Sequence, residues 1–153
     1  MNLSNMLTTR IKAKKPVRIG LIGAGKFGSM ILSQARHIEG ISITALAELD
    51  IQKAKDSFHR VGWDTSNCFA NSANEAVISG KTWLTEDSSE VFKIPEIECI
   101  VEATGDPLFG VQHALLAIES KKHVVMVNVE ADVLCGPYLN QKALENNVVF
   151  SMA

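Results

Sequence analysis

The sequence predicts an α/β fold, a doubly wound parallel sheet that forms a single three-layer domain. Short apolar runs typical of buried strands alternate with segments of helical periodicity along the chain. The length of 153 residues is about that of one domain, and the 46% hydrophobic composition can fill a sizeable core. Six predicted strands joined by helical crossovers favour the strand order 3-2-1-4-5-6.

The first half of the chain gives three of these strands. In chain order, we predict a strand at 17–22, a helix at 26–38, a strand at 41–47, a helix at 51–61, a short helix within "SANEAVISG", a strand at 82–85 and a helical turn at 87–92. Gly62 and Gly80 follow two of the helices, where glycine commonly ends a helix. Residues 63–81 are the least regular part.

The second half has clearer periodicity. We predict strands at 97–103, 123–128 and 148–152, and helices at 107–120 and 137–146. The first of these strands is an almost continuous apolar run, as expected for a strand that is covered on both faces. Pro107 and Pro137 suit a first helical turn, where the missing N–H has no helical partner to lose.

The composition excludes several classes of protein. Fifteen basic against seventeen acidic residues, a net charge of −2, give no electrostatic case for binding nucleic acid or an anionic membrane. No apolar run is long enough to span a bilayer. Cys68, Cys99 and Cys135 form no CxxC pair, so we expect reduced thiols in a cytoplasmic protein. Residues 1–15 are expected to form an N-terminal arm or short docking helix, and residues 16–153 the domain.

The histidines give no metal or catalytic pattern. No zinc-ligand spacing, phosphate-binding P-loop or Ser-His-Asp arrangement is present, so no metal site is predicted. All four histidines are predicted at the surface or at helix ends: His37, His59, His113 and His123. Glu102 lies inside a predicted strand, so it needs a polar partner if it is buried, and the sequence does not identify one.

A glycine motif follows the first strand and opens the first helix of the domain. It matches G-x-G-x-x-G and consists of Gly23, Ala24, Gly25, Lys26, Phe27 and Gly28. The first glycine permits a tight turn, the second lets a pyrophosphate approach the backbone, and the third lets helix and strand pack closely. Free N–H groups at the helix start would then bind phosphate oxygens. The motif therefore predicts a dinucleotide site of the Rossmann type.

An acidic residue stands where such a site needs one. Glu48 ends the second strand, twenty positions after Gly28, and we predict that it accepts hydrogen bonds from the adenosine ribose. Asp50 is a competing candidate, although it is also placed to cap the next helix. A 2′-phosphate would be repelled by Glu48 unless a nearby arginine or lysine compensated for the charge. Residues 49–59 contain no arginine, although they contain Lys53 and Lys55, and on this balance the sequence favours NAD over NADP.

Two later strand ends supply further candidates. Thr104 and Gly105 are predicted to border the cofactor, with simple helix capping by this turn as the alternative. Asn128 is the predicted neighbour of the nicotinamide. Glu130 and Asp132 could serve in acid/base catalysis or bind substrate, but a solvated loop with an acidic cap explains them equally well.

Three stretches together resemble a known family. They are "PVRIGLIGAGKFGSMIL", "VEATGDP" and "KKHVVMVNVEADVLCGP", and they are similar to the N-terminal NAD(P)-binding part of homoserine dehydrogenase-like oxidoreductases that carry a C-terminal SAF-type domain. This group includes the deoxyxylulose-phosphate reductoisomerase-like enzymes, which use NADPH. The resemblance implies hydride transfer between a nicotinamide cofactor and a small hydroxy or carbonyl substrate, homoserine-like or sugar-derived.

Two departures from the family pattern limit what it implies. Homoserine dehydrogenases have an Asn-Lys pair after the fifth strand, whereas here Asn128 precedes Val129, which puts homoserine itself in doubt. Family members also continue into a catalytic and dimerising region. We therefore expect this chain to bind dinucleotide but not to catalyse, with the substrate held mainly by that missing region and homodimer formation left open. The alternative is a nucleotide-sensing regulatory Rossmann module without catalysis.

Overall fold

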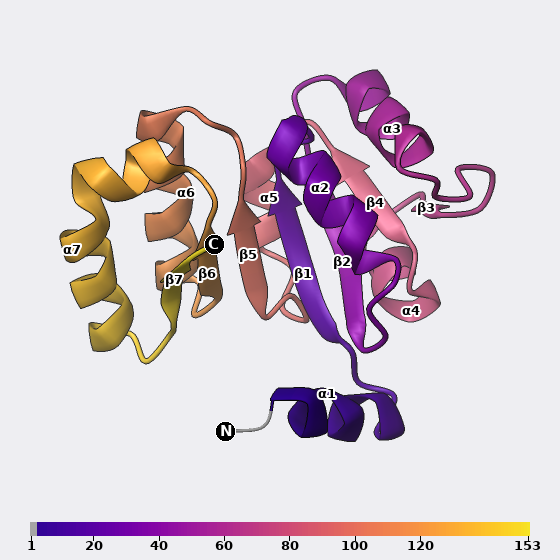
Figure 1. Ribbon diagram of the computed structural model, residues 1–153, viewed down its shortest axis with the longest axis horizontal. Helices are drawn as coiled ribbons and strands as arrows, with labels where there is room; N and C mark the ends of the chain where they lie inside the picture. Colours follow the sequence, from indigo (N-terminus) through magenta and orange to yellow (C-terminus); the bar gives the residue numbers. More distant parts are fainter. Residues whose placement is uncertain (1–2) are drawn as a thin grey trace.

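The strands run parallel in one sheet, with helices on both faces (Figure 1). The computed structural model describes residues 3–153, and within them the sheet has seven strands in the order β3-β4-β2-β1-β5-β6-β7. The strands are β1 (Val17–Ile22), β2 (Ile41–Ala47), β3 (Phe69–Ala70), β4 (Thr82–Thr85), β5 (Cys99–Glu102), β6 (His123–Met126) and β7 (Phe150–Met152). Leaving aside the two-residue β3 at one edge, this is the predicted order 3-2-1-4-5-6.

The helices alternate with the strands, as predicted. They are α1 (Leu3–Lys12), α2 (Lys26–Ala35), α3 (Ile51–Arg60), α4 (Ala73–Ser79), α5 (Ser88–Phe92), α6 (Pro107–Glu119) and α7 (Val129–Glu145). Among the described residues, no helix combines the length and the apolar character that a membrane crossing requires.

Alternating strand residues build two separate cores. Leu21, Leu46 and Val101 face the core shared with α2 and α3, which is centred on the fully buried Phe58. Their neighbours along the strands face the other core, with α5, α6 and α7; these include Ile22, Ala45, Ala47 and Ile100. Successive strand side chains point to opposite faces, so a strand covered on both sides must be apolar throughout. This confirms the predicted three-layer arrangement.

Two parts of the predicted element pattern are wrong. The edge strand β3 was not predicted, because two residues carry no readable period. The last long helix does not begin at Pro137 but at Val129, so this proline lies inside α7. Both Pro137 and Val133, whose carbonyl loses its helical partner, are exposed, so water can satisfy the unpaired group. Glu130 and Asp132 consequently lie in the first turn of a helix.

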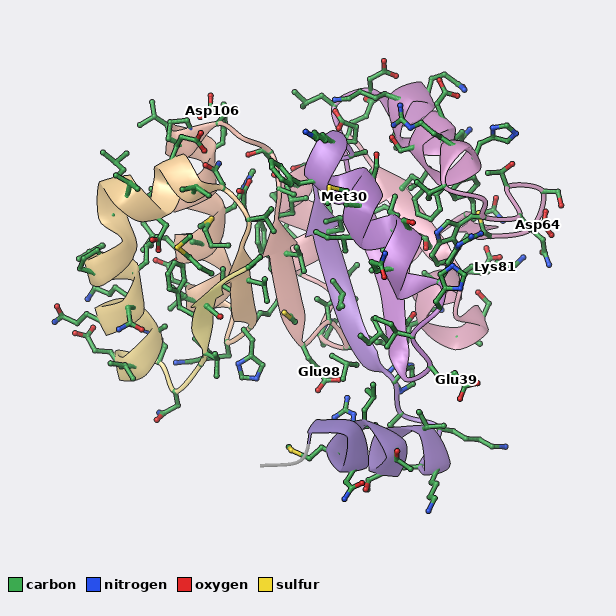
Figure 2. The ribbon with its side chains drawn as sticks, in the orientation of Figure 1. Met30, Glu39, Asp64, Lys81, Glu98 and Asp106 are labelled. Atoms are coloured by element: carbon green, nitrogen blue, oxygen red, sulfur yellow. The ribbon has the colours of Figure 1, made fainter. Side chains whose placement is uncertain are left out.

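The N-terminal helix lies at the end of the sheet opposite to the carboxyl ends of the strands (Figure 1). The guanidinium of Arg10 donates to the backbone carbonyl of Pro16 and forms an ion pair with Glu98. Glu98, just before β5, points toward this helix (Figure 2). Gly40 has no side chain to keep the helix away, and a Cβ there would lie 2.8 Å from side-chain atoms of Leu7 and Ile11.

The Cys99 thiol should react slowly in native protein. Burial raises the pKa of the Cys99 thiol to about 11. Because the thiolate is the reactive form, we expect its alkylation by iodoacetamide at pH 8 to be about 100-fold slower in native than in urea-unfolded protein. Mass spectrometry of tryptic peptides after timed labelling measures both rates in one sample. Equal rates in the two states would contradict the prediction.

Candidate functional site

A pocket of about 380 Å³ opens at the carboxyl ends of β1, β2 and β5. In parallel sheets this edge, at the point where the strand order reverses, is the usual ligand-binding position. The pocket is lined by Ile22, Gly23, Gly25, Ala47, Glu48, Leu49, Lys53, Glu86, Ser88, Ala103, Thr104, Asp106, Phe109 and His113. Both the glycine turn and the acidic residue at the end of β2 therefore face the same space.

The three glycines of the motif meet different requirements. Gly23 has a φ of +96°, and a Cβ there would lie 2.8 Å from the carbonyl oxygen of Ala103. A Cβ at Gly28 would lie 2.1 Å from the carbonyl oxygen of Gly23, so the turn itself leaves no room for a side chain. Gly25, on the pocket wall, is the opposite case: a Cβ added there would have no atom within 4 Å. Gly23 and Gly28 are therefore required for the close packing of the turn, whereas Gly25 leaves the backbone accessible to a ligand.

The helix that starts at this turn lacks a side-chain cap. Each of the helices α3 to α7 is preceded by a capping residue whose side chain accepts a hydrogen bond from a backbone amide of the first turn. These residues are Asp50, Ser72, Asp87, Asp106 and Asn128. Gly25, which precedes helix α2, has no side chain to make such a bond. The first amides of an α-helix have no partner within the helix, and the helix dipole makes this end attractive to anions. The uncapped start of α2 is therefore suited to phosphate oxygens.

Glu48 connects the glycine turn to helix α3. Its side chain is 9% exposed. Oxygen Oε2 accepts a hydrogen bond from the backbone N–H of Ala24 at 2.8 Å and another from Nζ of Lys53 at 3.0 Å. The hydroxyl of Ser57 donates to the carbonyl oxygen of Ala24 at 2.9 Å. The turn is thus held on both sides before any ligand binds, which is the preorganisation that tight binding requires.

A buried polar cluster lies beside the pocket, and it overturns one prediction. His113 is buried, not at the surface: its Nδ1 lies 3.3 Å from Oε1 of Glu102, and its Nε2 lies 3.1 Å from the hydroxyl of Ser88. Glu102 is fully buried, and its Oε1 also accepts hydrogen bonds from the amide and hydroxyl of Thr104. Within residues 3–153, its other oxygen, Oε2, has no hydrogen-bond partner.

The predicted site residues divide into two groups. Thr104 lines the pocket, as do Gly23, Gly25 and Glu48, whereas Lys26 and Phe27 are exposed on the first turn of α2. Gly105, with φ +79°, follows Thr104 but is not part of the lining.

The predicted residues after β6 lie outside the pocket lining. Asn128 is 2% exposed: its Oδ1 accepts from the amide of Ala131, and its Nδ2 donates to the carbonyl oxygen of Asp106 at 2.7 Å. It thereby ties the start of α7 to the start of α6, where Asp106 lies (Figure 2). Glu130 is exposed, and Asp132 packs over Gly136.

The lining residues that the sequence analysis did not predict include His113, Leu49 and Phe109. His113 falls on the stripe of α6 that also buries Gly110, Ala114 and Ala117, so helical periodicity could have placed it inside. Leu49 and Phe109 are 85% and 57% exposed at the pocket. No pattern in the sequence indicates that they share one surface. Within the described part of the chain, no three His, Cys, Asp or Glu side chains are grouped to hold a metal ion.

Comparison with known proteins agrees with this geometry. Residues 17–126 match the GFO/IDH/MocA family, described as an oxidoreductase family with an NAD-binding Rossmann fold. The match covers β1 to β6 and so includes the glycine turn and the whole pocket lining. This chain belongs to that oxidoreductase family.

One curated relative is similar in sequence, and solved structures share the fold. A homoserine dehydrogenase of Pseudomonas aeruginosa is 28% identical over 136 residues, which are 88% of this chain but only 28% of the relative. The structure of a homoserine dehydrogenase from Thiobacillus denitrificans superposes with a TM-score of 0.70 at 22% identity, over 90% of this chain and 29% of that one. Biliverdin reductase from Synechocystis, solved with biliverdin and NADP⁺, superposes with a TM-score of 0.66 at 20% identity, over 90% and 37% of the two chains.

Membership of the family confirms the predicted resemblance and the Rossmann fold. The chain is an NAD-binding oxidoreductase domain, similar in sequence to the corresponding part of a homoserine dehydrogenase. A purely regulatory nucleotide-sensing module is not favoured. The chain spans between a quarter and two fifths of the length of these three relatives.

Proposed function

We propose that this chain is the dinucleotide-binding part of an NAD(P)-dependent oxidoreductase acting on a small hydroxy or carbonyl compound. The observation that carries the proposal is the uncapped start of α2. Unlike α3 to α7 it has no side-chain cap, and no protein atom lies within 4 Å of the position that a Cβ on Gly25 would occupy. The bound nicotinamide would supply or accept the hydride. This chain's residues would hold and orient the dinucleotide.

The cofactor-binding residues follow from the pocket. The first amides of α2, in the turn Gly23–Gly28, would bind the diphosphate, and Glu48 would accept from the ribose through Oε1, because Oε2 already has two donors. Thr104 would border the ligand from β5. Gly105 and Asn128 remain predicted cofactor neighbours, and Glu130 and Asp132 remain predicted catalytic or substrate-binding groups.

The activity of a whole enzyme is a further step of the proposal. We propose that substrate-binding groups come mainly from a region beyond this chain, and that the chain by itself binds cofactor without turnover. Its coverage of only 28% of the homoserine dehydrogenase relative supports this.

Three cysteines without a disulfide support a cytoplasmic location. NAD is the predicted dinucleotide, with Glu48 as the group that would oppose a 2′-phosphate.

Replacing Glu48 with alanine should weaken NADH binding. We expect the dissociation constant to rise about tenfold, since the ribose loses an acceptor and the amide of Ala24 loses its partner. Titrating NADH into the protein and following its fluorescence measures this directly. Glu39→Ala, on an exposed acid before β2, is the matched control and should bind as the original chain does. An unchanged affinity in Glu48→Ala would refute the role of Glu48, and no NADH binding by the original chain would refute the proposed function.

A further inference from the structure

A hydrogen-bonded network of two serines and one arginine supports the glycine turn from outside the pocket. The hydroxyl of Ser57 donates to the carbonyl oxygen of Ala24 at 2.9 Å, and the hydroxyl of Ser29 donates to that of Gly25 at 2.8 Å. Nη2 of Arg60 donates to both hydroxyl oxygens, at 3.0 Å to Ser57 and at 3.1 Å to Ser29. None of these three side chains belongs to the pocket lining, so the network can affect a ligand only through the turn.

The guanidinium of Arg60 sets the direction of both hydroxyls. Ser57 is fully buried and Ser29 is 8% exposed, so water has little access to either oxygen. Within residues 3–153, Arg60 is the donor to both of these oxygens. A serine hydroxyl has a single hydrogen, and an oxygen that accepts from Arg60 keeps that hydrogen for the carbonyl of the turn.

The two carbonyls share their peptide groups with amides at the start of α2. The carbonyl of Ala24 is in the same planar group as the N–H of Gly25, and the carbonyl of Gly25 is in the same group as the N–H of Lys26. In a trans peptide these two bonds point in opposite directions, and the described residues contain no cis peptide. Holding the carbonyls on the serines therefore directs both amides away from them. Neither amide has an acceptor within the helix.

The charge of Arg60 is not neutralised by an acid. In the described part of the chain, no carboxylate forms an ion pair with this guanidinium. The last turn of α3 favours a basic residue because of the helix dipole. That preference accounts for a cation at this position, but not for its contact with two buried hydroxyls that both reach the glycine turn.

We propose that Arg60 is a positioning residue for diphosphate binding, although it does not touch the ligand. Its charge polarises the two hydroxyls, these polarise the carbonyls of the turn, and the amides of Gly25 and Lys26 become stronger donors. Hydrogen bonds in such a chain strengthen one another, and a cation at one end suits an anion at the other. The inference rests on the proposed function, since it assumes that phosphate oxygens bind these amides.

The test compares two exposed arginines that both join α2 to α3. Arg60→Met removes the guanidinium and keeps a flexible side chain. Arg36→Met is the matched control, because Nη1 of Arg36, at the end of α2, donates at 2.6 Å to the carbonyl of Gly62, which follows α3. We expect the NADH dissociation constant, measured by fluorescence titration, to rise about tenfold in Arg60→Met and to stay unchanged in Arg36→Met. Urea unfolding midpoints should be the same for both variants, since both arginines are exposed.

Two further measurements separate a chain through the hydroxyls from a general effect of charge. In a protein that carries Ser29→Ala and Ser57→Ala, adding Arg60→Met should cause no further loss of NADH affinity. In the protein without ligand, the backbone amide signals of Gly25 and Lys26 should move in ¹H–¹⁵N spectra of Arg60→Met. The same two signals should stay in place in Arg36→Met.

The outcomes distinguish this inference from the proposed function. The role of Arg60 is overturned by an unchanged NADH affinity in Arg60→Met, by an equal loss in Arg36→Met, or by a further loss once both serines are absent. Unmoved amide signals of Gly25 and Lys26 overturn it as well. In each of these cases NADH binding by the original chain still supports the proposed function. Failure of the original chain to bind NADH overturns both.

Discussion

Replacing Gly28 with alanine should destabilise the domain by about 3 kcal/mol or more and reduce NADH affinity at least about 100-fold. In an ordinary helix interior the same change would stabilise the protein by up to about 1 kcal/mol, because alanine has the higher helix propensity. Here the added Cβ would lie 2.1 Å from the carbonyl oxygen of Gly23. The turn must shift to make room, and its amides shift with it. Urea unfolding and NADH titration measure the two effects.

Gly25→Ala is the matched control for this prediction. Its Cβ would meet no protein atom within 4 Å, and the residue has a φ of −70°, which alanine readily adopts. We expect its unfolding free energy to stay within about 0.5 kcal/mol of the original, while NADH binding weakens because the methyl group occupies the ligand's space. If Gly28→Ala were as stable as the original chain, the close contact between Gly28 and the carbonyl of Gly23 would be wrong.

Replacing Glu102 with alanine should cost about 3 kcal/mol of unfolding free energy. The carboxylate is fully buried, and Oε1 is the acceptor for the amide and hydroxyl of Thr104 and lies 3.3 Å from Nδ1 of His113. Alanine would leave buried polar groups without partners and a cavity beside them. The midpoint of urea unfolding is the measurement.

Two variants show whether the loss comes from these contacts. Glu102→Gln keeps an acceptor oxygen and should retain more than half of the stability that Glu102→Ala loses. Glu98→Ala removes a partly exposed carboxylate whose partner is Arg10, and should cost less than about 1 kcal/mol. Equal unfolding midpoints for Glu102→Ala and Glu98→Ala would contradict the assignment.

Several features of the site could be predicted because they depend only on residues that are close together in the sequence. The turn Gly23–Gly28 follows an apolar run and opens a helix, so its shape depends on residues a few positions apart. Asp50 and Asp106 cap the helices that directly follow them, as their local positions indicate. The predicted start of the last long helix, Pro137, is eight residues later than the observed start, Val129. Proline commonly marks a first helical turn, whereas asparagine, as at Asn128, is found in many loops as well as at helix caps.

The partners of individual polar groups could not be predicted in this way. The hydrogen bond from the amide of Ala24 to Glu48 joins residues 24 positions apart in the sequence. The hydrogen bond from Ser57 to the carbonyl oxygen of Ala24 joins residues 33 positions apart. The burial of His113 against Glu102 depends on how α6 packs on β5. The sequence predicts Glu48 as a site residue, and Glu48 lines the pocket, but no pattern indicates that it supports the turn or that it pairs with Lys53.

The sequence alone determined the alternation of strands and helices and the glycine turn, because burial on two faces and backbone freedom are local properties of residue type. The order of the sheet was predicted from the doubly wound arrangement that this alternation favours. Only the tertiary structure decided which charges neutralise one another at the pocket and which polar groups are buried. Those outcomes depend on distances between side chains from separate strands and helices, which packing sets and no local pattern records.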